Sequence, residues 1–302
     1  MAYRYAILDV FTATPLAGNQ LAVLPDASGL DDARMQAVAR EFNLSETVFV
    51  FPPANPLHTA AIRMFTPAEE LPFAGHPTVG TALLLALAKN IATGTGPEMM
   101  LVLEEKVGPV RCGVFLKDAR SGHAIFDVPR KPEAVDAPMD REAFAMALGL
   151  LPAEIGFENH EPSAFTCGTP YVFVPVRNLD AMAKARPNPG VWDTAFGREA
   201  SAAYLYCRET MEKASAFHAR MFAPQIGIAE DPATGSAAAA FAGVVHRFDR
   251  LPSGTYRRTI EQGFEMGRPS IMRLEIDVEH GAIAAARVGG DAVVIAEGGL
   301  TV

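Results

Sequence analysis

The sequence predicts an α+β fold made of two similar lobes, each with a mixed β-sheet curled around one buried helix. The first observation is an internal repeat, because MFTPAEELPFAGHPTVGTA at 64–82 is matched by MFAPQIGIAEDPATGSAAAA at 221–240. Both copies open with Met-Phe-x-Pro, pass through a loop with acidic residues and reach a Gly before a small-residue or apolar helix. The second observation is that strand-like segments far outnumber helical ones. Two copies are too few for a solenoid, so we interpret the repeat as a duplicated half-domain.

The first half begins with strands and one amphipathic helix. β-branched and aromatic residues predict strands at 5–11 and 21–24, separated by a loop that contains Pro and Gly. The segment 31–42 carries apolar residues at helical spacing and two acidic residues at its start, which predicts a helix. Further strands are expected at 48–51 and 59–65.

The first buried helix follows these strands. Gly-His-Pro-Thr at 75–78 opens the apolar run 79–88, where Pro suits a first helical turn and a nearly all-apolar helix is a buried one. A hairpin over 99–116 and a strand at 123–128 complete this half. A lobe boundary is expected near 117–122.

The second half contains the same kinds of element. Helices are predicted at 140–148, at 178–185 and after Thr234-Gly235-Ser236, where 237–245 is apolar. The segment from 186 to 197 is rich in loop residues. Strands are predicted at 171–176, 202–208, 215–222, 255–262, 270–278, 282–288 and 292–300. We therefore expect a first lobe at 1–118 and a second lobe at 119–286.

The composition narrows the class of protein. The chain has 302 residues, of which 49% are hydrophobic, so it is long enough for two globular cores. Its net charge of −9, from 26 basic and 35 acidic residues, argues against a nucleic-acid or anionic-membrane surface. The chain opens on a strand-like run without a signal peptide, and no apolar run approaches the ~20 residues of a membrane span. Together with three cysteines that lack CxxC spacing, this predicts a cytoplasmic protein.

Both buried helices begin at a Gly, and these helix starts are candidate anion sites. Aligning Gly75 with Gly235 places His76 opposite Ser236, with a three-residue insertion in the second copy. Helix N-termini present free N–H groups and partial positive charge, which bind carboxylates or phosphates. Two such ends facing one cleft would hold an anionic substrate from both sides. In the alternative interpretation, both glycines only form tight turns.

Four side chains near these helix starts are candidates for chemistry. Glu46 lies between a helix and an apolar strand, where partial desolvation raises a carboxyl pKa towards that of a general base; the alternative is a surface Glu. His76 at a helix N-terminus favours the neutral form and could relay a proton, or it could only satisfy a turn. Asp231 is either a second acid in the cleft or a capping residue. Asn19 could cap a turn or hold a substrate.

Neither a metal nor a nucleotide site is predicted. The six other histidines show no ligand spacing: they are His58, His123, His160, His218, His246 and His280. The Gly pairs of the chain lack the context of a nucleotide fingerprint, and there is no GxSxG element or P-loop. We therefore expect no metal and no cofactor.

Several motifs together resemble the phenazine-biosynthesis isomerase family (PhzF-like). They cover the chain from near residue 5 to its end and are strongest over the first 90 residues and around Asp231. The motifs are Asp9-Val10-Phe11-Thr12 with Gly18-Asn19, the segment AREFNLSET at 39–47, Phe65-Thr66-Pro67, ELPFAGHPT at 70–78, and Asp231-Pro232-Ala233-Thr234-Gly235-Ser236-Ala237.

The resemblance implies the diaminopimelate epimerase-like fold, with the active site between two pseudo-symmetric lobes and the terminal strand, at 287–302, packed back on the first lobe. It implies a homodimer and a cofactor-independent isomerase, similar to trans-2,3-dihydro-3-hydroxyanthranilate isomerase. Glu46 would move a proton from one carbon to another, assisted by His76 and Asp231. The amides near Gly75 and Gly235, with His76 and Ser236 beside them, would hold the substrate carboxylate, and Asn19 would contact the substrate.

Two alternatives remain open at this point. The first is an epimerase or racemase of a small amino or hydroxy acid. Racemases on this fold use two thiols at the helix starts, whereas His76 and Ser236 stand there, and Cys112, Cys167 and Cys207 lie in or beside strands. Of the three, only Cys167 is a candidate for the cleft. The second alternative is a catalytically silent, ligand-binding homologue.

Overall fold

The computed structural model describes residues 2–93, 97–197 and 202–302, which form two compact units. Unit 1 comprises 1–129 and 288–302, and unit 2 comprises 130–287. The boundary lies later than the expected 118, because the strand β8 (Ser121–Asp127) pairs antiparallel with β7 (Gly108–Leu116) and so belongs to the sheet of unit 1.

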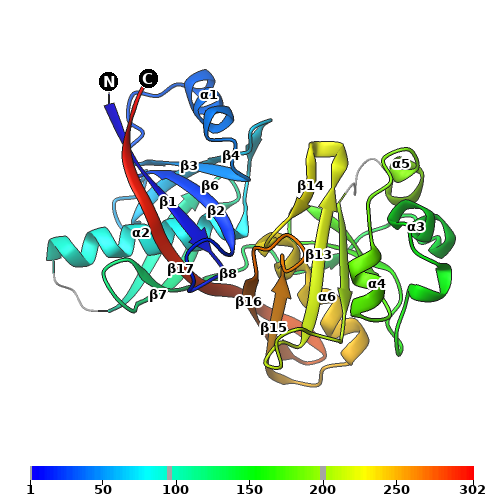
Figure 1. Ribbon diagram of the computed structural model, residues 1–302. Coiled ribbons are helices and arrows are strands. Elements are labelled where there is room, and N and C mark those ends of the chain that lie inside the picture. The colour runs from blue at the N-terminus through cyan, green and yellow to red at the C-terminus, as the bar shows by residue number, and fades with distance from the viewer. Residues whose placement is uncertain (1, 94–96, 198–201) are drawn as a thin grey trace. The chain divides into compact units, whose positions relative to one another are not determined.

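Unit 1 is a mixed sheet with two helices (Figure 1). Its parallel pairings include β2 with β3 and β4 with β6, and its other pairings include antiparallel hairpins. Its remaining elements are β1 (Ala2–Val10), β2 (Asn19–Leu24), α1 (Asp32–Phe42), β3 (Glu46–Phe51), β4 (Ala60–Phe65), β5 (Glu70–Leu71), α2 (Gly75–Thr93) and β6 (Glu98–Glu105).

Helix α2 is the centre of unit 1. It contacts β1, β2, β3, β6, β7 and β8, so the sheet curls around it. Many of its apolar residues, among them Val79, Leu83 and Ala86, are buried, whereas Leu84 and Leu85 are half-buried and Ala88 is exposed. Gly80 allows the close approach of the sheet, since a Cβ there would lie 2.6 Å from the side chain of Leu21.

Helix α1 covers the other side of the sheet of unit 1. Asp31 accepts a hydrogen bond from the backbone N–H of Arg34 and begins the helix, and Asn43 ends it in the left-handed conformation. Its buried face includes Met35 and packs in one cluster with Phe49 and Phe65.

Unit 2 repeats the order of unit 1 and adds helices. Its strands pair as in unit 1, because β11 is parallel to β12, β13 is parallel to β15, and β12–β13–β14 is an antiparallel meander. The elements are β9 (Glu133–Ala134), α3 (Arg141–Leu148), a 3₁₀ turn (Pro152–Glu154), β10 (Ser163–Thr166), β11 (Pro170–Pro175), α4 (Leu179–Lys184), α5 (Trp192–Phe196), β12 (Ala203–Cys207), β13 (Phe217–Ala223), a 3₁₀ turn (Pro224–Ile226), β14 (Ile228–Asp231), α6 (Gly235–Asp249), β15 (Gly254–Gln262) and β16 (Ser270–Glu279).

The sheet of unit 2 separates two cores. On one face α6 packs against the sheet, and Phe241 of α6 meets Phe217 of β13 with ring centroids 4.9 Å apart. On the other face a cluster contains residues of α3, α4 and α5 together with Phe222. Alternating residues of β13 therefore serve opposite faces.

Helix α5 was not expected from the sequence, which is rich in loop residues there. Trp192 and Phe196 are both fully buried, with ring centroids 4.3 Å apart. Contacts with the core therefore stabilise a helix of only five residues, which is too short to be stable alone.

The expectation of two separate strands at 282–288 and 292–300 is wrong, because β17 (Ala282–Thr301) is continuous. Gly289 and Gly290 do not form a turn; Gly289 stays in the strand and lies so close to β8 that a Cβ would be 2.6 Å from the backbone oxygen of Ala124. The strand starts in unit 2 and ends in unit 1. There it pairs antiparallel with β1, and Ala2 lies opposite Thr301. In Figure 1 the red end of the chain runs beside the blue β1.

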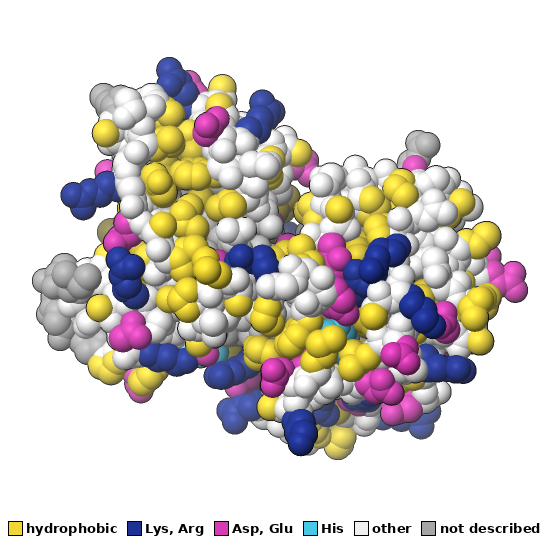
Figure 2. All heavy atoms as spheres, in the orientation of Figure 1, with side chains coloured by type: hydrophobic (Ala, Val, Ile, Leu, Met, Phe, Trp, Pro, Cys, Tyr) yellow, Lys and Arg dark blue, Asp and Glu magenta, His cyan; other side chains and the backbone are white. Residues whose placement is uncertain are grey.

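The surface carries charges of both signs. On the face drawn in Figure 2, basic and acidic side chains are interspersed, with hydrophobic side chains between them. Among the helices of the described residues, none combines the length and the apolar character needed to cross a membrane.

Candidate active site

Three strand and helix starts of unit 1 bring Asn19, Glu46 and His76 together. Asn19 is the first residue of β2, Glu46 is the first residue of β3, and His76 is the second residue of α2. The parallel pairing of β2 with β3 places Leu21 opposite Glu46, so both strands start at the same edge. The Nε2 atom of His76 lies 3.3 Å from Oε2 of Glu46, and its Nδ1 atom lies 3.3 Å from the amide nitrogen of Asn19.

The loop before β2 determines where Asn19 lies. Gly18 has a φ of +67°, and a Cβ there would overlap the backbone oxygen of Val10. The carboxylate of Asp9 accepts a hydrogen bond of 2.6 Å from the backbone N–H of Leu16, which fixes the loop from inside. Glycine is thus required immediately before the site residue.

The environment of His76 keeps its ring neutral. Burial lowers the pKa of His76 to about 3, and a hydrogen bond with the backbone of Gln20 opposes this shift only in part. The pair with Glu46 is therefore not an ion pair at neutral pH. The neutral imidazole therefore lies between the side-chain amide of Asn19 and the carboxyl group of Glu46.

Glu46 itself is a buried carboxyl group, with 9% of its surface exposed. A buried carboxyl group beside a neutral imidazole that carries a proton is suited to proton transfer. This corner of unit 1 also contains Gly75, the first residue of α2, which is buried like its neighbours. The structure therefore brings together all four site residues that the sequence predicted for unit 1.

The start of α6 in unit 2 holds the second group of predicted residues. Asp231 ends β14, and Gly235 and Ser236 begin α6. The hydroxyl of Thr234 donates a 2.6 Å hydrogen bond to Oδ2 of Asp231. Thr234 stands at the N-cap position but makes no capping hydrogen bond with its side chain, because that side chain serves Asp231 instead.

Two tyrosines of unit 2 were missed by the sequence analysis. The hydroxyl of Tyr171 is 2.7 Å from Oγ of Ser236. Tyr204 is fully buried, and its hydroxyl finds no hydrogen-bond partner among the described residues. Burial, and next the nearby charge of Asp231, hold the pKa of Tyr204 well above its usual value.

The position of Tyr204 follows from strand register. Tyr204 pairs with Met221, and Met221 pairs with Asp231, so the three residues form one row across β12, β13 and β14. Residues opposite one another on neighbouring strands project from the same face of a sheet. Tyr204 and Asp231 therefore lie on the face of the sheet that carries the start of α6.

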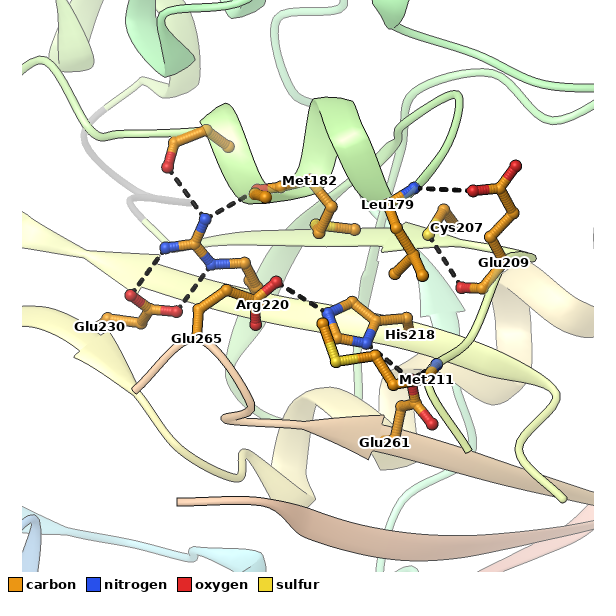
Figure 3. A network of polar contacts seen from close by, with 12 residues as sticks. Leu179, Met182, Cys207, Glu209, Met211, His218, Arg220, Glu230, Glu261 and Glu265 are labelled. Atoms are coloured by element: carbon orange, nitrogen blue, oxygen red, sulfur yellow. Dashed lines mark hydrogen bonds and ion pairs between the residues drawn. The ribbon is translucent and has the colours of Figure 1, made fainter. Parts of the chain in front are cut away.

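The internal duplication also includes one Arg–Glu ion pair in each unit. Arg63 makes a two-pronged contact with Glu70, with distances of 2.7 Å from Nε and from Nη2 to the two carboxylate oxygens. Arg220 makes the same contact with Glu230 at 2.8 Å, and it also donates to the backbone oxygen of Met182 (Figure 3). In the sequence, each copy of the repeat therefore reads Arg-Met-Phe-x-Pro followed by Glu-x-Pro-x-x-Gly. The sequence comparison based on Met-Phe-x-Pro did not include this Arg and this Glu.

The cysteines are not arranged for thiol chemistry. All three are free and buried. Burial raises the pKa of Cys167 and of Cys207 to about 12, and that of Cys112 well above its usual value. Cys167 is thus a protonated core residue at neutral pH. Within the described ranges, no group of three or more His, Cys, Asp or Glu side chains is placed to hold a metal ion.

Comparisons with known proteins place the chain in a family. The model of the phenazine biosynthesis-like protein family (PhzC-PhzF) matches residues 8–298. An uncharacterised isomerase of Mesorhizobium japonicum is 51% identical over 302 residues, with 98% of each chain covered. The trans-2,3-dihydro-3-hydroxyanthranilate isomerase of Pseudomonas fluorescens is 33% identical, again over 98% of each chain.

The structural comparison agrees with the sequence comparison. The crystal structure of a Bacillus anthracis phenazine biosynthesis protein of the PhzF family matches with a TM-score of 0.87 at 25% identity, over the full length of both chains. The predicted α+β fold, with a curled mixed sheet around a central helix in each half, is confirmed. The chain therefore belongs to the phenazine biosynthesis-like (PhzC-PhzF) family and is an enzyme of the isomerase class.

Proposed function

We propose that this isomerase moves a proton within a small carboxylate-bearing substrate, similar to trans-2,3-dihydro-3-hydroxyanthranilate. The observation that carries the proposal is the buried carboxyl group of Glu46, 3.3 Å from the neutral imidazole of His76. The name of the Pseudomonas fluorescens relative supports the class of substrate.

In the proposed reaction Glu46 acts as both base and acid. Its carboxylate removes a proton from one carbon of the substrate, and the electron pair of that C–H bond shifts into the neighbouring π system. The resulting carboxylic acid exchanges its proton with solvent and delivers a proton to another carbon, so that the overall reaction neither gains nor loses an atom. The neutral imidazole of His76, 3.3 Å from the carboxyl group of Glu46, assists by hydrogen bonding and by placing the proton. A single carboxyl group that performs both steps needs no cofactor.

Asp231 and the two helix starts complete the proposed site. The first-turn amides of α6 are not capped by Thr234, and helix N-termini favour bound anions. We assign the substrate carboxylate to the amides at Gly75, His76, Gly235 and Ser236, and hydrogen bonding to the substrate to Asp231, with Asn19 as a further contact.

The alternative of a thiol-dependent epimerase or racemase is less well supported. His76 and Ser236 occupy the second position of the two central helices, and the three thiols are buried with raised pKa values. An epimerase that uses Glu46 in place of thiols would give the same proton exchange with solvent, and it is distinguished by the stereochemistry of the product. A homodimer in the cytoplasm is part of the proposal through the family resemblance.

The test is proton exchange followed by NMR. The protein is incubated in D₂O with trans-2,3-dihydro-3-hydroxyanthranilate and, separately, with a panel of small cyclic and amino carboxylates. We expect deuterium at the carbon that receives the proton, and a loss of turnover by roughly 10²- to 10⁴-fold in Glu46→Gln, the range for removal of a general acid–base. Glu69→Gln is the matched control, because Glu69 is an exposed carboxylate of the same unit.

Each outcome has a distinct meaning. Full exchange activity in Glu46→Gln would show that another group moves the proton. A substrate that binds but shows no exchange with the wild-type protein would favour the catalytically silent, ligand-binding alternative. Inversion at one carbon without migration of a double bond would identify an epimerase.

A further inference from the structure

We propose that Gln262 and Glu105 are equivalent positioning residues, one in each unit, that hold the starts of the two central helices: Gln262 fixes Asp231 and the start of α6, and Glu105, as a neutral acid, fixes the start of α2. This inference rests on the proposed function only for its effect on catalysis; the contacts themselves are independent of it.

Strand register establishes that the two residues are equivalent. In unit 2, β13 pairs in parallel with β15, and His218 lies opposite Glu261. In unit 1, β4 pairs in parallel with β6, and Ala61 lies opposite Glu104. When the Arg-Met-Phe sequences at 63–65 and 220–222 are superposed, Ala61 matches His218 and Glu104 matches Glu261. The next residue of each strand is then Glu105 or Gln262, at the end of β6 or β15.

The preceding glutamates confirm this alignment by their contacts. Glu104 accepts hydrogen bonds from two successive backbone N–H groups, those of Ala54 and Asn55, and from His58. Glu261 likewise accepts from two successive backbone N–H groups, those at 211 and 212, and from His218, as Figure 3 shows in part. The duplicated scaffold therefore repeats these side-chain contacts as well as its strands.

Gln262 uses both ends of its amide on the turn that carries Asp231. Its Nε2 atom donates to the backbone oxygen of Asp231 at 2.7 Å and to the hydroxyl of Thr234 at 3.0 Å. Its Oε1 atom accepts from the backbone N–H of Thr234 at 3.3 Å. The Thr234 hydroxyl has one proton, which goes to Oδ2 of Asp231. Gln262 thus fixes both the backbone and, through Thr234, the carboxylate of Asp231.

The neighbouring Gly263 tightens the same turn. It has a φ of +80°, and a Cβ at this position would lie 2.6 Å from the backbone oxygen of Pro232. The end of β15 therefore packs directly on the loop between β14 and α6. This packing fixes the backbone of Gln262, so that its side chain is already positioned for its hydrogen bonds.

Glu105 makes the corresponding contact in unit 1. The hydroxyl of Thr78 is 2.8 Å from Oε1 of Glu105 and 2.8 Å from the backbone oxygen of Ala74. A protonated Glu105 can donate to this hydroxyl, which leaves the single hydroxyl proton of Thr78 for the carbonyl oxygen of Ala74. Glu105 is then a carboxylic acid with one donor and one acceptor, as an amide is. Burial raises the pKa of Glu105 to about 8, and the contact with Thr78 opposes this shift only in part, so the neutral acid predominates at pH 7.

The two contacts act on the residues of the candidate active site. Ala74 immediately precedes Gly75 and His76, and Thr234 immediately precedes Gly235 and Ser236. Neither Glu105 nor Gln262 is assigned a contact with substrate. Their role is to hold the helix start in the orientation that chemistry needs, where small displacements have large effects on rate.

The experiment compares apolar and conservative variants by two readouts. Gln262→Leu and Thr234→Val remove the hydrogen bonds with little change of size, Thr234→Ser keeps the hydroxyl, and Glu105→Gln keeps a neutral group. The control is Gln36→Leu, because Gln36 of α1 also donates to two backbone oxygens, those of Thr66 and Pro67, which are outside the turns that lead directly into α2 and α6. The first readout is amide hydrogen exchange of the segment 231–238 in the free protein. The second is kcat and KM for trans-2,3-dihydro-3-hydroxyanthranilate.

We expect exchange in 231–238 to become about tenfold faster in Gln262→Leu and Thr234→Val, but not in Gln36→Leu. We expect kcat to fall by about 10- to 100-fold while KM changes little, with recovery in Thr234→Ser and near wild-type activity in Glu105→Gln. Unchanged exchange in Gln262→Leu would overturn the positioning role, and so would a fall in kcat no larger than that of Gln36→Leu. If the wild-type protein turns over neither this compound nor any member of the carboxylate panel, the proposed function fails, while the exchange readout still decides whether Gln262 holds the turn.

Discussion

Replacing Glu105 by Gln should remove a pH dependence from the stability of the protein. Glu105 is 7% exposed, and burial raises its pKa from 4.5 to about 8. The folded protein therefore keeps a proton that the unfolded chain releases above pH 4.5. The contribution of this site to stability is fully present below pH 4.5 and falls as the pH rises, until it levels off above about pH 8.

The size of the effect follows from the pKa difference. The shift from 4.5 to about 8 corresponds to about 5 kcal/mol, at 1.36 kcal/mol for each pKa unit. Gln carries no titratable proton, yet it can donate to Thr78 as the carboxylic acid does. The free energy of unfolding of Glu105→Gln, relative to wild type, should therefore increase by about 5 kcal/mol between pH 4.5 and pH 8.

Urea unfolding of both proteins at several pH values between 4.5 and 9 measures this difference directly. All other titrating groups are common to the two proteins and cancel. Glu98→Gln is the control, because Glu98 is exposed at the opposite end of the same strand, β6. A difference between wild type and Glu105→Gln that stays constant from pH 4.5 to pH 8 would refute the assignment of Glu105 as a buried neutral acid.

Three further predictions concern single positions. Gly243→Ala should lower the free energy of unfolding by about 1–3 kcal/mol in urea titrations, since the added methyl group would overlap the ring of Phe165; unchanged stability would contradict this packing. Burial lowers the pKa of His218, but hydrogen bonds to two glutamates outweigh burial and raise the pKa to about 9. Its imidazole signals in NMR should therefore titrate near pH 9, and the stability from this cation should be present below pH 6.5 and lost as the pH rises through 9. Gly18→Ala should reduce both activity and stability, measured by proton exchange and urea unfolding, because it forces a side chain into a backbone with φ +67° next to Val10; wild-type behaviour would show that the loop can rearrange.

Local sequence patterns were sufficient for most of the elements. The helices that start at Asp32 and Gly75, and the strands between them, follow from apolar spacing, caps and breakers, which are properties of neighbouring residues. Helix α5 and the continuous strand β17 were missed because tertiary packing overrides the local signal there. The buried ring of Trp192 stabilises a short helix, and Gly289 extends where a Gly pair usually indicates a turn.

In the candidate site, too, some residues are marked by local sequence signals and others are placed only by tertiary structure. Glu46 and His76 stand beside recognisable signals, a strand start and a helix start, and both were predicted. Tyr204 and Gln262 reach the turn of Asp231 only through the register of strands that are distant in sequence. No window of sequence around either residue contains that information. A longer alignment of the two halves would have identified Gln262. It would superpose Arg-Met-Phe at 63–65 and 220–222, and then Glu-Glu at 104–105 with Glu-Gln at 261–262.

The pairing of β1 with the end of β17 has a consequence for the order of folding. Residue 2 lies opposite residue 301, so the first unit is discontinuous in sequence, whereas the second is formed by one uninterrupted segment. During synthesis on the ribosome, the second unit can acquire its complete set of strands before the first unit does. Until the last residues emerge, one edge of β1 remains unpaired and open to association with other chains. A release of the nascent chain before about residue 288 would leave that edge exposed permanently.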